Sequence, residues 1–190
     1  MHEGEPKLSE TILKRGNMFE LVHIEQPDGR IFEVARRAPG VRLVIADHPN
    51  RKLLLSKEFR RELNDWDYRL PGGKVFDSLE EYDKFRKLGG DITQAAASKG
   101  KAEGHEEVGI EINGLKLIKK STLGATVEWD LFVFEATDWQ AHPAGQKLEA
   151  GEEIEADKWF SYDEAEQMVM DGKMQEERIA LILLQWLHKQ

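Results

Sequence analysis

The tripeptide Pro71-Gly72-Gly73 divides the chain into two parts with different patterns. Neither a helix nor a central strand tolerates it, because proline lacks a backbone N–H and glycine loses more conformational freedom on folding than other residues. Before it, the β-rich runs 18–26 and 30–36 flank Pro27-Asp28-Gly29. Asp-Gly between two such runs predicts a β-hairpin.

Residues 74–190 alternate between helical and strand patterns. Leu79, Tyr82 and Phe85 recur at a spacing of three, which predicts an amphipathic helix over 78–88. Asp91 is a good N-cap for a second helix that runs to Val108 and stops at Gly109. Further strands are expected at 41–46, 52–55, 115–120, 129–135 and 154–160, and further helices at 162–171 and 175–188. This order predicts an α/β (α+β) fold with a mixed central sheet and helices on both faces.

The length of 190 residues fits one domain with a substantial core. We expect that domain over 18–190, after a loose N-terminal segment over 1–17. Cysteine is absent, which excludes a disulfide framework and a thiolate zinc site and makes the reducing cytoplasm the expected location. No apolar run is long enough to span a bilayer, and the first residues are too polar for a secretion signal.

The formal net charge is −9, from 36 acidic and 27 basic residues. A field of this sign opposes binding to nucleic acids and to anionic membranes. It does not oppose a phosphorylated small molecule, because a bound divalent cation inverts the local potential where carboxylates cluster. We therefore expect a small-molecule partner, and neither nucleic acid nor membrane.

Three glutamates near the end of the second predicted helix carry the most chemistry. On a helix, Glu106 and Glu107 lie about −60° and +40° around the axis from Glu103, so the three carboxylates share one face. Like charges so close to a helix C-terminus repel each other and oppose the helix dipole. The face is either solvated, with help from Lys99 and Lys101, or it holds a hard cation such as Mg²⁺, with Mn²⁺ as the alternative ion.

The segment around these glutamates resembles the Nudix box, which is a Gly, five residues, a Glu, seven residues, and then Arg-Glu-apolar-X-Glu-Glu-X-Gly-apolar. Gly73 matches the leading glycine. The second half of the box is matched by Glu103, Glu106, Glu107, Gly109 and Ile110. The order of strands and helices over residues 18–190 is also similar to this family. The resemblance implies a Nudix-like α/β/α sandwich with an added N-terminal β-hairpin.

The chain departs from the box in four ways. The arginine position falls on Ala102, about fifteen residues further from Gly73 than the pattern places it, so the box contains an insertion at 77–92. The first glutamate position falls on Gln94, and an apolar position falls on Gly104. The helix predicted inside the insertion is either a lid or substrate-selecting wall, or a plain surface helix.

The resemblance implies a Mg²⁺-dependent hydrolase in which Glu103, Glu106, Glu107 and the Gly72 backbone hold the ion. Glu103 and Glu107 would also be catalytic. The ion would neutralise a diphosphate and lower the pKa of the attacking water. Gly72 and Gly73 would approach the substrate closely.

The base that completes deprotonation of this water often lies, in similar enzymes, in a late acidic loop. Here that loop is 148–154, with Glu152 as the first choice and Glu153 as the second; the alternative is that these charges serve only solubility. Three arginines are expected to contact phosphate or ribose, namely Arg60, Arg61 and Arg69. The alternative for each of them is that it is an ordinary surface arginine.

The layout resembles the branch that cleaves ADP-ribose and nucleotide sugars, although that branch carries Glu-X-Pro-Ala-Gly where this chain has Arg69-Leu70-Pro71-Gly72-Gly73. It also carries Ser-Pro-Gly where this chain has Thr122-Leu123-Gly124. We expect hydrolysis of a nucleoside diphosphate linked to another group. A catalytically weak or inactive nucleotide-sensing module is the alternative, and a generic acidic scaffold is a third. The β-rich N-terminal segment, which packs across a dimer interface in similar enzymes, predicts a homodimer.

Overall fold

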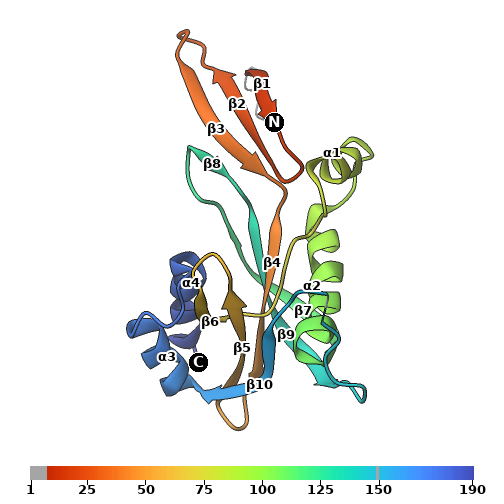
Figure 1. Ribbon diagram of the computed structural model, residues 1–190, viewed down its shortest axis with the longest axis vertical. Coiled ribbons are helices and arrows are strands. Elements are labelled where there is room, and N and C mark those ends of the chain that lie inside the picture. The colour runs from red at the N-terminus through yellow and green to blue at the C-terminus, as the bar shows by residue number, and fades with distance from the viewer. Residues whose placement is uncertain (1–7, 149) are drawn as a thin grey trace.

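Two sheets form the framework of the protein in the computed structural model, which describes residues 8–148 and 150–190 (Figure 1). One has the strand order β1-β2-β3-β8, and the other has the order β10-β5-β4-β9-β7 with β6 paired to β5. The strands are β1 (Ser9–Arg15), β2 (Phe19–Glu25), β3 (Ile31–Arg37), β4 (Gly40–Asp47), β5 (Lys52–Arg60), β6 (Asp65–Arg69), β7 (Ile110–Ser121), β8 (Val127–Glu128), β9 (Leu131–Ala141) and β10 (Ile154–Ser161).

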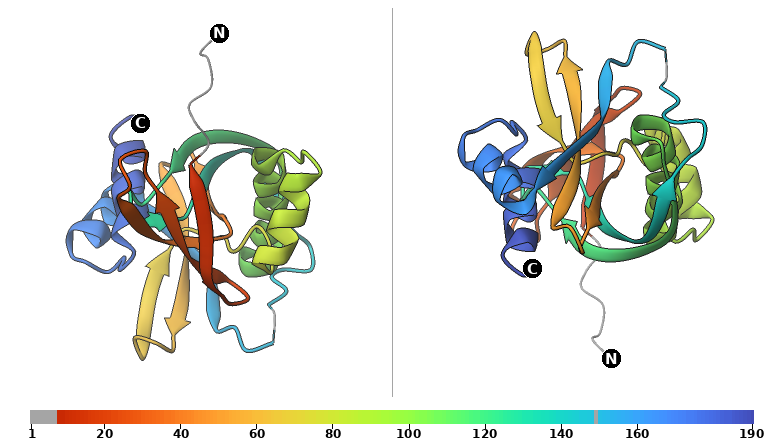
Figure 2. Two further views of the ribbon diagram at one scale, coloured as in Figure 1. Left: turned by 90° about the horizontal axis from the view of Figure 1, so that it is seen from above. Right: turned by 90° about the horizontal axis from the view of Figure 1, so that it is seen from below.

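Helices cover both faces of the larger sheet, with α2 on one side and α3 and α4 on the other (Figure 2), whereas α1 lies beyond α2, beside the N-terminal sheet (Figure 1). Their bounds are α1 (Leu79–Lys87), α2 (Ile92–Val108), α3 (Tyr162–Met170) and α4 (Glu177–Leu187). The sheet is mixed, because β4 pairs in parallel with β9 and antiparallel with β5. The α/β/α sandwich predicted from the element order is thus confirmed.

Strand β4 lies in the middle of this sandwich and is buried on both faces. All of its residues except Asp47 are buried, as expected for a strand that packs against helices on each side. Its alternate side chains enter two different cores. Val44 and Ala46 pack with Leu183 of α4, whereas Val41 and Leu43 belong to the core that contains Ala96 of α2.

Helix α2 is fixed by its caps and by a close approach to the sheet. The Asp91 side chain accepts hydrogen bonds from the N–H groups of Thr93 and Gln94, and Gly109 ends the helix in a left-handed conformation. In the middle of the helix, a Cβ at Gly104 would lie 2.6 Å from Cδ1 of Ile112. The missing side chain therefore lets α2 lie directly on β7 and β4, which explains a glycine where the box has an apolar residue.

The insertion joins the N-terminal sheet to α2. Its helix α1 has Ser78 as its N-cap, and Leu79 donates its N–H to the Asn17 carbonyl at 2.9 Å. Phe76, Leu79 and Tyr82 form a small core with Ala38. The insertion therefore packs against both the N-terminal sheet and α2. Its role as a lid or substrate-selecting wall stays a prediction.

Two elements differ from the sequence expectation. Residues 1–17 were expected to be loose, but Ser9–Arg15 form β1, paired antiparallel with β2. Every residue of β1 is exposed, so no burial pattern marks it in the sequence. The polar run Asp65–Arg69, which had no assignment, forms β6 against the second half of β5.

Among the helices of residues 8–148 and 150–190, none combines the length and the apolar character that crossing a membrane requires.

We predict that Gly104→Val lowers the free energy of unfolding by about 1–3 kcal/mol, because the added carbons overpack the α2–β7 contact. Gln94→Val is the control for the valine side chain itself, since Gln94 is exposed on the same helix. Valine in place of glutamine lowers helix propensity, whereas valine in place of glycine raises it, so a larger loss at Gly104 reports overpacking alone. Urea unfolding measures both variants. Equal losses in the two would show that overpacking does not contribute.

Candidate active site

A cavity of about 380 Å³ lies where α2, the glycine turn and the strands β3 to β6 meet. Its walls carry charges of both signs and are formed by Arg37, Arg42, Glu58, Arg60, Arg69, Gly72, Gly73, Lys74, Asp77, Lys99, Glu103, Glu106, Glu107, Trp129, Leu131 and Glu152. The three glutamates predicted to share one face of the helix thus line the same cavity as the glycine turn.

The glycine turn approaches α2 so closely that no side chain fits between them. Gly72 has a φ of +136°, which other residues rarely adopt, and a Cβ at Gly73 would overlap the Glu103 carboxylate. Two backbone hydrogen bonds hold the turn on β4, from Val41 to the Gly73 carbonyl and from Leu43 to the Pro71 carbonyl, both at 2.9 Å.

Glu107 is the most tightly held of the three glutamates. Its side chain is buried, and Oε2 accepts a hydrogen bond from the Gly72 N–H at 2.6 Å. Burial raises its pKa to about 8, against the opposing effects of the Arg42 charge and of the Gly72 N–H. The nearby charge of Glu103 raises the pKa further.

Glu103 and Glu106 share one ammonium group. Lys99 Nζ lies 3.2 Å from Glu103 Oε1 and 3.5 Å from Glu106 Oε2. Burial raises the pKa of Glu103, and the Lys99 charge opposes this effect. Lys99 therefore supplies positive charge between two of the carboxylates.

The donor set fits a hard divalent cation, because carboxylate oxygens are the ligands that Mg²⁺ prefers. The ammonium group of Lys99 already offsets the negative charge of Glu103 and Glu106. The positive charge of a cation would be favourable beside the same carboxylates. Within residues 8–148 and 150–190, no three His, Cys, Asp or Glu side chains converge as a preformed metal cluster. Binding an ion would therefore require the glutamates to draw together and Lys99 to move aside.

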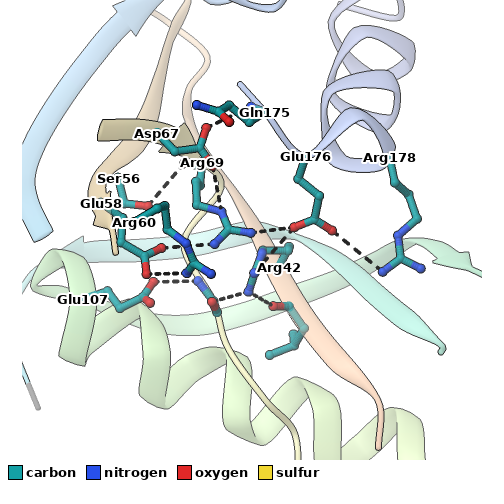
Figure 3. A network of polar contacts seen from close by, with 12 residues as sticks. Arg42, Ser56, Glu58, Arg60, Asp67, Arg69, Glu107, Gln175, Glu176 and Arg178 are labelled. Carbon is teal, nitrogen blue, oxygen red and sulfur yellow. Dashed lines mark hydrogen bonds and ion pairs between the residues drawn. The ribbon is translucent and has the colours of Figure 1, made fainter. Parts of the chain in front are cut away.

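The three arginines predicted to contact substrate lie in different surroundings, and Figure 3 shows two of them, Arg60 and Arg69. Arg69 lines the cavity but is engaged with Glu176 at 2.6 Å and Glu58 at 3.2 Å. Arg60 also lines the cavity, 2.7 Å from Glu58 Oε1. Arg61 is exposed outside the cavity, so the structure brings two of the three together.

The late acidic loop reaches the cavity through Glu152, which is exposed and lines its wall. Glu153 is also exposed and lies 3.8 Å from Arg61 Nη2. Glu149 of this loop lies outside the described residues. The structure thus brings the first-choice base, but not the second, to the wall of the cavity.

Sequence reasoning missed several charged residues of this site, above all Arg42 of β4. Its guanidinium Nη1 donates to the carbonyl oxygens of Val41 and Gly72, at 3.0 Å to Val41 (Figure 3). Glu176, just before α4, lies 3.9 Å from Arg42 and was also missed. A signal for Arg42 was present, because it is the one charged residue inside the apolar run 41–46.

Trp129 forms the far wall and contacts two further guanidinium groups. The guanidinium carbons of Arg37 and Arg178 lie 4.2 and 4.1 Å from the centre of its ring system. Arg37 also lies 5.1 Å from the Phe19 ring of β2. Cation–π contacts thus connect the N-terminal sheet, the cavity wall and α4.

Comparisons with known proteins place this site in a family. A search of curated proteins found no match. A structure described as "Crystal structure of ADP compounds hydrolase" is similar over 98% of this chain and 96% of that one, with a TM-score of 0.63 and 20% identity, and so shares the fold. The sequence model of the NUDIX domain matches residues 36–182, which is most of the chain and includes the glycine turn and all three glutamates. The chain belongs to the Nudix family of hydrolases.

Proposed function

We propose that the protein hydrolyses the diphosphate bond of a nucleoside diphosphate linked to another group, with Mg²⁺ as the cofactor. One observation carries this proposal: Glu103, Glu106 and Glu107 line the same cavity as the glycine turn. Glu107 is also hydrogen-bonded to that turn. Mn²⁺ is the alternative ion, because it accepts the same oxygen ligands.

Glu103, Glu106 and Glu107 would hold the ion, with the Gly72 carbonyl as a further ligand. When bound, the ion would neutralise charge on the diphosphate and make water more acidic. Arg60 would stabilise the phosphoryl oxygens from the opposite wall. Gly72 and Gly73, having no side chains, leave room for the diphosphate beside the helix.

Glu152 is the proposed general base. It is exposed on the wall of the cavity, and there it would accept a proton from the attacking water. Its carboxylate comes from a loop outside α2, so proton acceptance is separated from the three glutamates proposed to hold the ion. Glu153, beside Arg61, is the second choice.

ADP-ribose and nucleotide sugars are the favoured substrates. The structural neighbour is described as a hydrolase of ADP compounds, and its likeness to this chain extends over nearly the full length of both. The arginines of the cavity support an anionic substrate.

A nucleotide-sensing module without turnover is the second candidate. Lys99 favours it, since its ammonium lies between two of the proposed metal ligands and competes with the ion. Ala102, in place of the box arginine, favours it as well. Thermal stabilisation by a nucleotide sugar without any turnover would support this candidate.

We predict that the protein, incubated with Mg²⁺, releases a monophosphate from at least one diphosphate-linked compound. The panel to assay contains ADP-ribose, GDP-mannose, UDP-glucose, dinucleotides and nucleoside triphosphates. Glu107→Gln should lower the rate by at least about two orders of magnitude, on the order of 3 kcal/mol. The matched control is Glu111→Gln, an exposed position just beyond α2. No release from any compound, together with no metal binding by calorimetry, would falsify the hydrolase.

We predict a characteristic pH dependence for the stability of the metal-free protein. The pKa of Glu107 is about 8 in the folded state, above its ordinary value of 4.5. Folding therefore favours the protonated form, so its stabilising contribution is complete below pH 4.5 and is lost as the pH rises through about 8. Glu107→Gln should gain stability relative to the wild type across this range.

Urea unfolding in the presence of a chelator, at several values of pH between 5 and 8.5, measures this difference. Parallel stability curves for the two proteins would contradict the raised pKa. Added Mg²⁺ should bring the wild type back toward the variant at high pH, because the ion binds the deprotonated carboxylate.

We also predict a homodimer formed through the N-terminal sheet. Strands β1 to β3 expose Ile12, Leu13, Phe19, Ile31 and Phe32, an unusual concentration of apolar side chains on one sheet. Sedimentation equilibrium should give about twice the chain mass of 21.8 kDa. Ile31→Lys should shift the protein toward the monomer, and a wild type that sediments only as a monomer would refute the prediction.

A further inference from the structure

In the Nudix box the arginine orients a glutamate of the helix, and in this chain its position carries no cation. Ala102 occupies it on α2, and the side chain of alanine can neither donate a hydrogen bond nor carry charge. The carboxylate of Glu107 must be ionised to hold a metal ion, and an ionised carboxylate at this buried position requires polar partners, because an unpaired buried charge costs several kcal/mol. A guanidinium from another element lies beside it.

That guanidinium belongs to Arg42 of β4. Arg42 is only 9% exposed, in a strand that is otherwise apolar up to Asp47. Burying a guanidinium in such a strand is unfavourable unless its donors find acceptors. Nη1 finds two of them, the carbonyl oxygens of Val41 and of Gly72.

Gly72 is held from both sides. Its carbonyl accepts from Arg42, and its N–H donates to Glu107 Oε2 at 2.6 Å. The Gly72 N–H belongs to the peptide group between Pro71 and Gly72, and the Gly72 carbonyl belongs to the next one, between Gly72 and Gly73. Arg42 therefore restricts the peptide group that follows the one bonded to Glu107. Backbone hydrogen bonds from β4 fix the residues on either side of Gly72, and Arg42 adds the bond that fixes the Gly72 carbonyl itself.

Arg42 is in turn restrained by Glu176, whose Oε2 lies 3.9 Å from Nη2. The same Oε2 lies 2.6 Å from Nη2 of Arg69 (Figure 3). A chain of polar contacts therefore leads from the residue before α4, through Arg42 and the glycine turn, to Glu107.

We propose that Arg42 replaces the missing box arginine as a positioning residue, and that it orients Glu107 through the Gly72 peptide. The inference rests on the proposed function, and it explains how the chain keeps a workable metal site with Ala102 in the box. Arg42 acts through Gly72 and Glu107, and it does not touch the reacting atoms in this role.

The test compares Arg42→Met and Arg42→Lys with Arg178→Met. Removing a side chain that orients a metal ligand typically costs about 10- to 100-fold in metal affinity or activity, and we expect Arg42→Met to lose this much in kcat and in Mg²⁺ affinity measured by calorimetry. The KM of the substrate should change much less. Arg42→Lys keeps the charge and one potential donor to the Gly72 carbonyl, so it should recover part of both losses.

Arg178→Met is the matched control. Arg178 is equally enclosed and lies 3.8 Å from Glu176, but its hydrogen bond goes to the Trp129 carbonyl and not to Gly72. A role of Arg42 in stability alone predicts that both methionine variants lower the unfolding midpoint and spare kcat and Mg²⁺ affinity. That outcome would overturn the proposal.

Two further outcomes are decisive. Should Arg42→Met fail to fold, Arg42→Lys carries the test, and a folded lysine variant with wild-type kcat and Mg²⁺ affinity overturns the positioning role. A wild type without turnover or metal binding overturns the proposed function and this role with it. Normal wild-type turnover with unaffected Arg42 variants overturns only this role.

Discussion

The hydrogen bond between the Gly72 N–H and Glu107 connects two segments that the chain separates by 35 residues. It brings the carboxylate of a helix against the two glycines of the turn, where both line the cavity. The carboxylate is buried, so this bond and the neighbouring guanidinium of Arg42 offset part of the cost of removing it from water. The site exists only where α2 can lie directly on the sheet, which Gly104 permits.

Four guanidinium groups from strands β3 to β6 and three carboxylates from α2 line the same cavity, together with Lys99 of α2 and Glu58 of β5. Two of the cavity arginines, Arg42 and Arg69, are paired with Glu176, the residue just before α4. These ion pairs preorganise the guanidinium groups, which need not be assembled when an anionic ligand enters.

The sequence made part of this site predictable because the signals were local. The spacing of Glu103, Glu106 and Glu107 requires only that the segment be helical, and Asp91 and Gly109 mark the ends of that helix. The partners of Arg42 and Arg69 are not local, since Glu176 is 107 residues from Arg69. No periodicity encodes such pairs.

Strand β1 escaped prediction for a related reason: with all of its residues exposed, its pairing with β2 depends on backbone hydrogen bonds that carry no side-chain pattern. Strand β6 is similar, because Asp65–Arg69 is mostly polar and is set by its register with β5. Tertiary context decides both elements.

The contacts of Arg37 with Phe19 and Trp129 give the N-terminal sheet a share in the cavity. The stretch that matches the NUDIX domain begins at residue 36, so Phe19 belongs to a part of the chain that the family pattern does not describe. One wall of the cavity is thus supported by a strand outside the matched domain. A change in the N-terminal sheet can therefore alter that wall while leaving the glutamate helix intact.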